Sequence, residues 1–315
     1  MTRMDNALYG PTDPATTAGY DAPPKRKGFF TDTSICIGCK ACEVACKEWN
    51  DVPEDGLVLS GMSYDNTQGL GASTWRHVAF IEQPKQLGSQ EANLKHAVVD
   101  LGMPATAPPG TGRDPGTATD FRWLMESDVC KHCTHAGCLD VCPTGALFRT
   151  EFGTVVVQDD ICNGCGYCVP ACPYGVIERR EGPKDAHAVG LAQKCTLCYD
   201  RLIDGNEPAC AKACPTKSIQ FGDLDELRER AAGRLDQLVE AGVDGAQLYG
   251  HDPDNGVGGT GAFFLLLDEP EVYGLPPDPV VPTRDLPEMW RTAGSAALAL
   301  LAGAAALFAA AGRRS

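Results

Sequence analysis

Four cysteines near the N-terminus constrain the fold more than any other part of the chain. The spacing C-x2-C-x2-C-x3-C is formed by Cys36, Cys39, Cys42 and Cys46. Three thiolates on one loop and a fourth on the following helical turn suit a cubane iron–sulfur cluster, whose four irons each take one thiolate. Zinc sites usually take their cysteines in separated pairs. The motif therefore favours a [4Fe–4S] cluster over a zinc ion.

The pattern recurs three times and uses every remaining cysteine. The later quartets are Cys130, Cys133, Cys138 and Cys142; Cys162, Cys165, Cys168 and Cys172; and Cys195, Cys198, Cys210 and Cys214. The last cysteine of each is followed by a proline: Pro143, Pro173 and Pro215. This ending is typical of bacterial two-cluster ferredoxins, in which the fourth cysteine ligates the other cluster of the pair. Lys47 takes the place of the proline in the first quartet. Sixteen cysteines in this pattern predict four [4Fe–4S] clusters.

Two other uses of the cysteines are a disulfide framework and structural zinc. Disulfide frameworks belong mostly to short secreted domains, whereas this chain has 315 residues and no recognisable signal peptide or twin arginine. Structural zinc is the rival from another functional class, a protein without redox chemistry. Visible absorption separates the two, because clusters make a protein brown and zinc leaves it colourless.

The charge of the chain excludes one large class of partner. The formal net charge is −15. Four oxidised cubanes with their thiolates would add about −8 and bring the total to roughly −23. A chain this acidic offers no broad basic face for nucleic acid, and it favours partners with basic patches.

The order of the quartets predicts the domain organisation. Quartets two and three are adjacent and are followed by similar short segments, 145–148 and 175–178, which indicates an internal repeat. Quartet one must then reach across them to quartet four. The predicted fold is α+β and loop-rich, with two nested two-cluster ferredoxin units. The inner unit is 126–180, and the outer unit is 28–125 with 181–222 and carries an insertion at 51–120. Strands are expected at 73–82, 145–149 and 154–158.

The remaining segments lie outside these units. Residues 1–27 are rich in Pro, Thr, Gly and Asp and are expected to form a disordered tail. Residues 223–290 form a C-terminal extension, with a helix from an Asp223 N-cap to about Glu240, a strand at 262–267, and an extended proline-rich linker at 274–287.

The C-terminus predicts a single transmembrane helix at 291–312. Residues 293–311 are apolar or small, and no charge occurs between Arg291 and Arg313. This length suffices to span a bilayer; the alternative is a helix packed against a partner. Arg313 and Arg314 favour a cytoplasmic C-terminal end, which would place the cluster domain on the outer face of the membrane.

With these motifs in place, the chain resembles a known family, the four-cluster electron-transfer subunits of molybdopterin oxidoreductases. Within it the chain is most similar to the beta subunits of membrane-associated formate dehydrogenases. The segments that carry the resemblance are 36–50, 194–198, 248–250 and 256–260. It covers about residues 28–270.

The resemblance implies which cysteines share a cluster. The four implied ligand sets are Cys36, Cys39, Cys42 and Cys214; Cys195, Cys198, Cys210 and Cys46; Cys130, Cys133, Cys138 and Cys172; and Cys162, Cys165, Cys168 and Cys142. In the nitrate reductase relatives a tryptophan replaces one cysteine and a cluster loses an iron. Here every position is cysteine, so four complete cubanes are expected.

The resemblance also implies the function. The chain is expected to have no catalytic site and to relay electrons from a molybdenum or tungsten pterin subunit that oxidises formate. The acceptor would be a membrane cytochrome b or another quinone-reducing subunit. The same relay could serve a hydrogenase or a reductase of sulfur compounds or sulfoxides, and co-purified subunits would separate these possibilities.

Overall fold

A four-stranded sheet joins segments from the two ends of the cluster-bearing region. The computed structural model describes residues 5–6, 10–11, 13–56, 64, 67–84, 121–183 and 187–312. The sheet has the order β10-β3-β12-β11, formed by Ile219–Asp223, Lys27–Asp32, Ala262–Leu266 and Gln247–Tyr249. Strand β3 pairs antiparallel with β10 and parallel with β12. The segment before the first quartet is thereby hydrogen-bonded to the segment after the fourth.

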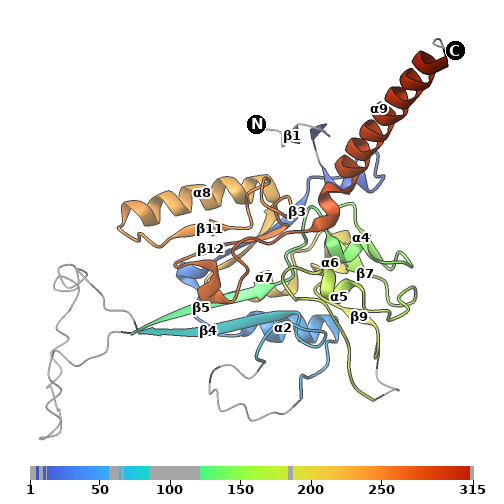
Figure 1. The fold of residues 1–315 in the computed structure, drawn as a ribbon. Coiled ribbons are helices and arrows are strands. Elements are labelled where there is room, and N and C mark those ends of the chain that lie inside the picture. Colours follow the sequence, from blue (N-terminus) through green and yellow to red (C-terminus); the bar gives the residue numbers. More distant parts are fainter. Residues whose placement is uncertain are drawn as a thin grey trace, which may run out of the picture.

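The two faces of this sheet are buried against different parts of the molecule. Successive side chains of a strand point to opposite faces. Phe30 and Phe263 stack with ring centroids 5.3 Å apart and form one apolar cluster with helix α8 (Leu224–Glu240). Their strand neighbours Phe29 and Phe264 belong to the apolar cluster that contains cysteines of the first and last quartets. The sheet therefore lies between α8 and the cysteine-bearing body (Figure 1).

The inner unit is built from short elements around the second and third quartets. Helices α4 (Gly137–Asp140) and α5 (Cys168–Ala171) are in contact. Strands β6 (Leu147–Arg149) and β7 (Val155–Val157) form the predicted hairpin, and β8 (Glu178–Arg179) pairs with β9 (Ala192–Gln193). These elements enclose a separate apolar cluster.

The described part of the insertion at 51–120 leads into a long hairpin. Strands β4 (Arg76–Pro84) and β5 (Phe121–Val129) pair antiparallel along their whole length, and the hairpin extends from the body beside α2 (Ala41–Asn50) (Figure 1). The prediction of a strand at 73–82 is confirmed, although the strand starts at Arg76 and ends at Pro84. Residues 85–120 of the insertion lie outside the described residues.

The expectation of a disordered tail at 1–27 is wrong for residues 13–27. Helix α1 (Pro14–Thr17) starts at an Asp13 cap, and Ala15 is buried. The Arg26 guanidinium donates to Thr134 Oγ1 at 2.8 Å and to the His132 carbonyl at 2.9 Å. Polar composition indicated disorder, but the contacts that order this segment come from residues more than one hundred positions away. Strands β1 (Asp5–Asn6) and β2 (Gly10–Pro11) pair, and residues 1–4, 7–9 and 12 lie outside the described residues.

The C-terminal extension is close to its prediction up to the linker. Helix α8 begins after Asp223 and buries Leu224, Leu227, Ala231 and Leu238, although the Asp223 carboxylate pairs with Lys27 and does not cap the helix. The proline-rich linker lies on the body: Leu275 and Val281 are buried, and the Val281 N–H donates to the Gly256 carbonyl at 3.1 Å. The short helix η2 (Pro270–Tyr273) precedes the linker, and η3 (Pro282–Asp285) lies within it.

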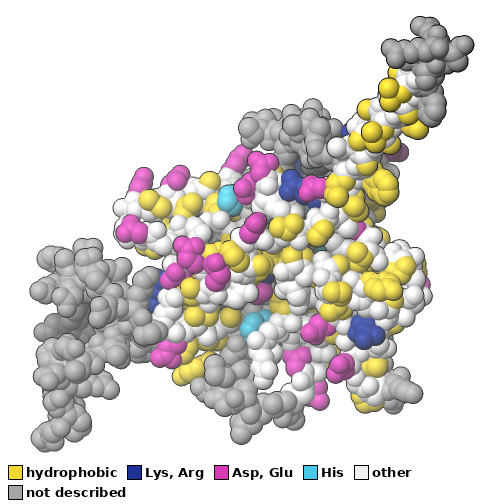
Figure 2. Space-filling model, viewed as in Figure 1, with side chains coloured by type: hydrophobic (Ala, Val, Ile, Leu, Met, Phe, Trp, Pro, Cys, Tyr) yellow, Lys and Arg dark blue, Asp and Glu magenta, His cyan; other side chains and the backbone are white. Residues whose placement is uncertain are grey.

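Helix α9 (Leu286–Gly312) leaves the body at an angle, and over most of its length no other described segment lies beside it (Figure 1). Hydrophobic side chains lie along it in Figure 2, and Leu298, Leu300, Leu301 and Leu307 are all exposed. Among the described residues, Pro282–Leu307 is the one stretch long and apolar enough to cross a membrane by length and composition.

Candidate metal centres

The structure gathers the sixteen cysteines into four groups of four. The first group consists of Cys36, Cys39, Cys42 and Cys214, which line one cavity. The third group consists of Cys130, Cys133, Cys138 and Cys172, which line another. In the second group Cys46 lies among Cys195, Cys198 and Cys210, and in the fourth Cys168 lies among Cys142, Cys162 and Cys165. No disulfide joins any of the sixteen, and all are in the described part of the chain. The resemblance implied the same four sets as cluster ligands, and this ligand assignment stays a prediction.

In the first C-x2-C loop of each quartet, the residue before the second cysteine is in the left-handed region of backbone conformation. These residues are Gly38 at φ 63°, His132 at φ 45°, Gly164 at φ 71° and Leu197 at φ 58°, and in the fourth quartet Cys198 is also in this region, at φ 48°. Glycine adopts this conformation without strain, whereas His132 and Leu197 must be held there by their surroundings. Both are buried. The shared conformation shows that the four loops are copies of one turn, although only two carry the glycine that would predict it.

The fourth cysteine of each quartet follows a helical turn. Cys142, Cys172 and Cys214 end or follow α4, α5 and α7 (Ala209–Ala213), and the proline after each prevents further helix. In the first quartet Lys47 replaces the proline, so α2 continues beyond Cys46 to Asn50. Helix α2 contacts α7, which brings the first quartet beside the fourth. Helix α6 (Tyr199–Ile203) follows the loop of the fourth quartet.

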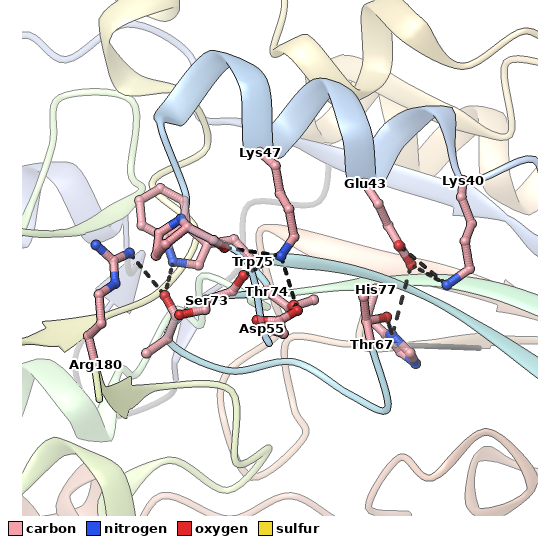
Figure 3. A network of polar contacts seen from close by, with 12 residues as sticks. Lys40, Glu43, Lys47, Asp55, Thr67, Ser73, Thr74, Trp75, His77 and Arg180 are labelled. Atoms are coloured by element: carbon pink, nitrogen blue, oxygen red, sulfur yellow. Dashed lines mark hydrogen bonds and ion pairs between the residues drawn. The ribbon is translucent and has the colours of Figure 1, made fainter. Parts of the chain in front are cut away.

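The polar face of α2 is anchored to the insertion and to β4 (Figure 3). The Glu43 carboxylate pairs with Lys40 at 3.3 Å and accepts from the backbone N–H of Val78 on β4. One turn later, Lys47 donates to the Ser73 carbonyl at 2.8 Å and to Asp55 at 3.0 Å. The described part of the insertion therefore fixes the helix that carries Cys42 and Cys46.

The spaces between the thiols suit a cluster better than a single ion. The cavities of the first and third groups measure about 290 and 370 Å³, including the part open to solvent. A zinc ion needs its ligands to converge at about 2.3 Å. Among the described residues, no three His, Cys, Asp or Glu side chains converge closely enough to hold one ion. Four thiols around a wider cavity are the donor set that an iron–sulfur cluster requires.

Burial makes most of these thiols poor acids until a cation binds them. Burial raises the pKa of Cys42 to about 11 and that of Cys138 to about 12, against the opposing charges of Arg76 and Lys194 respectively. Both cations are fully buried. A metal that binds these sulfurs must displace their protons, and the buried cations then compensate part of the thiolate charge.

The comparisons with known proteins point in the same direction. Two models of a 4Fe–4S dicluster domain match residues 35–146 and 121–224. The formate dehydrogenase iron–sulfur subunit of Haemophilus influenzae is 37% identical over 277 residues, which are 85% of this chain and 76% of that protein. The iron–sulfur subunit of the nitrate-inducible formate dehydrogenase of Escherichia coli is 37% identical over 276 residues, covering 86% and 79%. The chain belongs to the family of formate dehydrogenase iron–sulfur subunits.

A more distant relative extends this family. The B subunit of the anaerobic dimethyl sulfoxide reductase of E. coli is 32% identical over 203 residues, which are 64% of this chain and 76% of that protein. The two dicluster matches overlap between residues 121 and 146. The resemblance drawn from the cysteine motifs is thereby confirmed at the level of the family.

In this member of the family, sequence reasoning missed the donors that contact the sulfurs. The Asn50 amide lies 3.8 Å from Cys46 Sγ and 3.7 Å from Cys198 Sγ. The Leu197 N–H donates to Cys195 Sγ at 3.3 Å, and Arg76 donates to Cys210 Sγ at 3.3 Å. Every sulfur of the second group therefore has a donor within reach. No motif marks Asn50 or Arg76, because their role depends on the folded arrangement of α2 and β4.

Trp49 lies near the C-terminal end of α2 and contacts Asp200 and Arg201 of α6. Its indole N–H donates to Asp200 at 2.7 Å, the Arg201 guanidinium lies 4.2 Å from the ring centroid, and the side chain is 49% exposed. The indole therefore packs on Arg201 at the surface and is not part of the buried core.

Proposed function

We propose that each of the four cysteine groups binds one [4Fe–4S] cluster and that the chain relays electrons within a formate dehydrogenase complex. Electrons would come from a subunit that oxidises formate at a molybdenum or tungsten pterin, and they would leave to a membrane cytochrome b or another quinone-reducing subunit. The chain itself would have no catalytic site. When bound, the clusters supply one-electron transfer, which splits a two-electron oxidation into single steps.

The observation that carries this proposal is the spatial order of the groups. Three pairs of cysteines from different groups lie close enough for their charges to interact: Cys42 with Cys210, Cys195 with Cys130, and Cys138 with Cys168. The first group therefore lies next to the second, the second next to the third, and the third next to the fourth. The four groups follow one another in a single series. A line of redox centres is the arrangement that a relay needs.

The first and fourth groups, at the two ends of this series, each have a solvent-exposed cysteine. Cys39 in the first group and Cys165 in the fourth are exposed, whereas the second group is buried throughout and the third has no exposed member. Apolar side chains lie exposed beside both ends, Ile37 near Cys39 and Tyr167 near Cys165. We infer that one partner docks at the first group and the other at the fourth.

The protein residues supply position, burial and hydrogen bonds. Four copies of one loop conformation hold the cysteines, and the buried cation Arg76 and amide donors face the sulfurs of the second group. Burial and hydrogen bonding around a cluster are the means by which a protein sets its potential.

We propose that α9 anchors the subunit to the membrane beside its quinone-reducing partner. Its exposed leucines and its length support this role. The basic C-terminal residues support a cytoplasmic end, with the cluster domain on the outer face.

The deciding experiment uses the native complex purified through this chain. Formate is added and the clusters are followed by low-temperature EPR. Reduced-cluster signals, with a large molybdopterin subunit in the preparation, are expected. If formate leaves the clusters oxidised while dithionite reduces them, the relay stands and the formate assignment fails.

The similarity to the B subunit of a dimethyl sulfoxide reductase favours one alternative, the same relay with a sulfoxide or sulfur-compound reductase. In that case dimethyl sulfoxide would oxidise the dithionite-reduced clusters of the complex and formate would not reduce them. A hydrogenase partner predicts reduction by hydrogen. A colourless protein containing zinc would reject every form of the relay.

A further inference from the structure

Arg76 is a positive charge enclosed between the first and second cysteine groups. It opens β4, and its side chain is 1% exposed. Its Nη2 donates to Cys210 Sγ at 3.3 Å, and its Nη1 donates to the Ser127 carbonyl at 3.0 Å and lies 3.3 Å from Ser127 Oγ. That hydroxyl lies 3.2 Å from Cys42 Sγ. The guanidinium therefore contacts the second group directly and the first group through one hydroxyl.

No carboxylate among the described residues forms an ion pair with Arg76. Its guanidinium carbon lies 4.8 Å from the centroid of the Phe29 ring, and its Nε has no hydrogen-bond partner in the described part of the chain. The acid on the neighbouring strand, Glu126, is fully buried and forms no ion pair with Arg76 among the described residues, and burial raises its pKa well above its usual range, which disfavours its charged form.

The counter-charge of Arg76 is therefore the sulfur of the two groups. Cys210 of the second group accepts directly from the Arg76 Nη2, and Cys42 of the first group is linked to the Arg76 Nη1 through the Ser127 hydroxyl. A buried cation without a partner is strongly unfavourable, so anionic occupants of both groups are what make this position tenable.

We propose that Arg76 is a positioning residue for the relay, whose fixed charge raises the reduction potentials of the first two clusters. This inference rests on the proposed cluster assignment. Each electron that a bound cluster accepts would add one negative charge within its cysteine group, without a proton. A cation held nearby in a medium of low dielectric stabilises that added charge. The effect is larger for the second group, because the contact to Cys210 is direct.

The sharing of one cation has a consequence for electron transfer. Arg76 would stabilise an electron on the cluster of either group. When the electron passes from one cluster to the other, only part of its attraction to the guanidinium is therefore lost. Arg76 is the first residue of β4. Its neighbours Ser73 and Val78 form hydrogen bonds with Lys47 and Glu43 of α2. This region thus both positions the cysteines of the first quartet and supplies the charge between the two groups.

The test is an EPR-monitored redox titration of the anaerobically purified complex. In Arg76→Gln, which keeps hydrogen-bond donors and removes the charge, two of the four potentials are expected to fall, one more than the other. The larger shift should be at least tenfold in the one-electron equilibrium constant, which is ~59 mV. The other two potentials should stay unchanged. Arg76→Lys keeps the charge and should shift the larger of the two by much less.

Arg180→Gln is the matched control. Arg180 is also buried and donates to the Ala72 carbonyl at 3.0 Å, but it faces no cysteine. Its removal should leave all four potentials unchanged. Unchanged potentials in Arg76→Gln, or equal shifts in Arg76→Lys and Arg76→Gln, would overturn the proposal. So would an equal shift of all four potentials.

Ser127→Ala keeps the inference testable if Arg76→Gln fails to assemble. It removes the hydroxyl that links Arg76 to Cys42 and leaves the contacts of Arg76 with the Ser127 carbonyl and with Cys210, so one potential should fall and the potential linked to Cys210 should not. A Ser127→Ala complex with four wild-type potentials would count against the link. The titration uses dithionite and needs no formate, so failure of the formate assignment leaves it intact. Absence of iron would instead reject the proposed function itself.

Discussion

At the scale of single residues, the turn after each Cys-Pro pair holds the chain in one conformation. The third residue after the cysteine has a positive φ: 71° at Gly145, 63° at Gly175 and 55° at Lys217. Its N–H donates to the carbonyl of the cysteine, at 3.4, 3.2 and 3.3 Å respectively. The left-handed conformation costs a residue with a side chain roughly 1–2 kcal/mol, and glycine avoids this cost. Two of the three turns use the favourable residue.

This difference gives a paired prediction. A Cβ added to Gly175 meets no atom within 4 Å, so Gly175→Ala tests the backbone alone and should destabilise the holoprotein by about 1–2 kcal/mol. Lys217 is exposed, so Lys217→Gly should stabilise it by up to about 1 kcal/mol. Thermal unfolding under anaerobic conditions at one scan rate measures both. A less stable Lys217→Gly protein would contradict the argument.

Glu126 makes stability depend on pH. It is fully buried, and neither carboxylate oxygen has a hydrogen-bond partner in the described part of the chain. Burial and then Asp128 raise its pKa well above the ordinary value of 4.5, while Lys131 and Arg76 oppose them. In the unfolded chain the group loses its proton near pH 4.5, but in the folded chain it keeps it. The raised pKa therefore contributes fully to the free energy of unfolding below about pH 4.5. This contribution is lost as the pH rises toward the pKa of Glu126 in the folded chain.

We therefore expect Glu126→Gln to gain stability over the wild type as the pH rises. The gain should grow by up to about 1.4 kcal/mol per pH unit over the window in which only the unfolded chain is ionised. Thermal midpoints of both proteins at about pH 5 and about pH 8 test this. Parallel pH profiles would show that Glu126 is ionised in the folded protein.

At the scale of elements, the sequence predicted those whose signal is local. The hairpin β6–β7, helix α8 and strand β12 follow from periodicity within a few residues. The segment 13–27 was misjudged because distant contacts order it, such as the hydrogen bond from Tyr20 to the Arg149 carbonyl. The same limit applies to the metal centres. The cysteines are visible as a motif, whereas Asn50, Ser127 and Arg76 become sulfur neighbours only after α2, β4 and β5 have packed.

Helix α9 gives the prediction that belongs to this scale. Removing residues 291–315 takes away most of the apolar helix and leaves the Val281 contact with the body in place. The truncated subunit should therefore leave the membrane fraction and keep its full iron content. Membrane flotation and iron analysis of the two proteins measure this. Retention in the membrane fraction would mean that partner subunits, and not α9, hold the protein there.

At the scale of the whole molecule, the motifs predict the nested order of the quartets but not the packing around it. The Cys-Pro motifs indicate an exchange of fourth cysteines, and the inner pair is adjacent in sequence. The outer pair is joined by two features without a motif, the contact of α2 with α7 and the sheet in which β3 lies beside β10. Sequence also left the insertion without a role, because its function depends on what it and the adjoining hairpin contact.

The exchange of cysteines is tested most directly at Cys214. It lines the first cavity with Cys36, Cys39 and Cys42, although in sequence it completes the quartet of Cys195. Cys214→Ser should therefore damage the cluster of the first group and spare that of the second. Cys210→Ser is the matched control, because Cys210 belongs to the second group and should give the opposite result. Iron content and EPR of both variants distinguish them: two different signals should be lost or altered. If Cys214→Ser and Cys210→Ser alter the same signal, the last quartet serves one cluster and the nested arrangement is wrong.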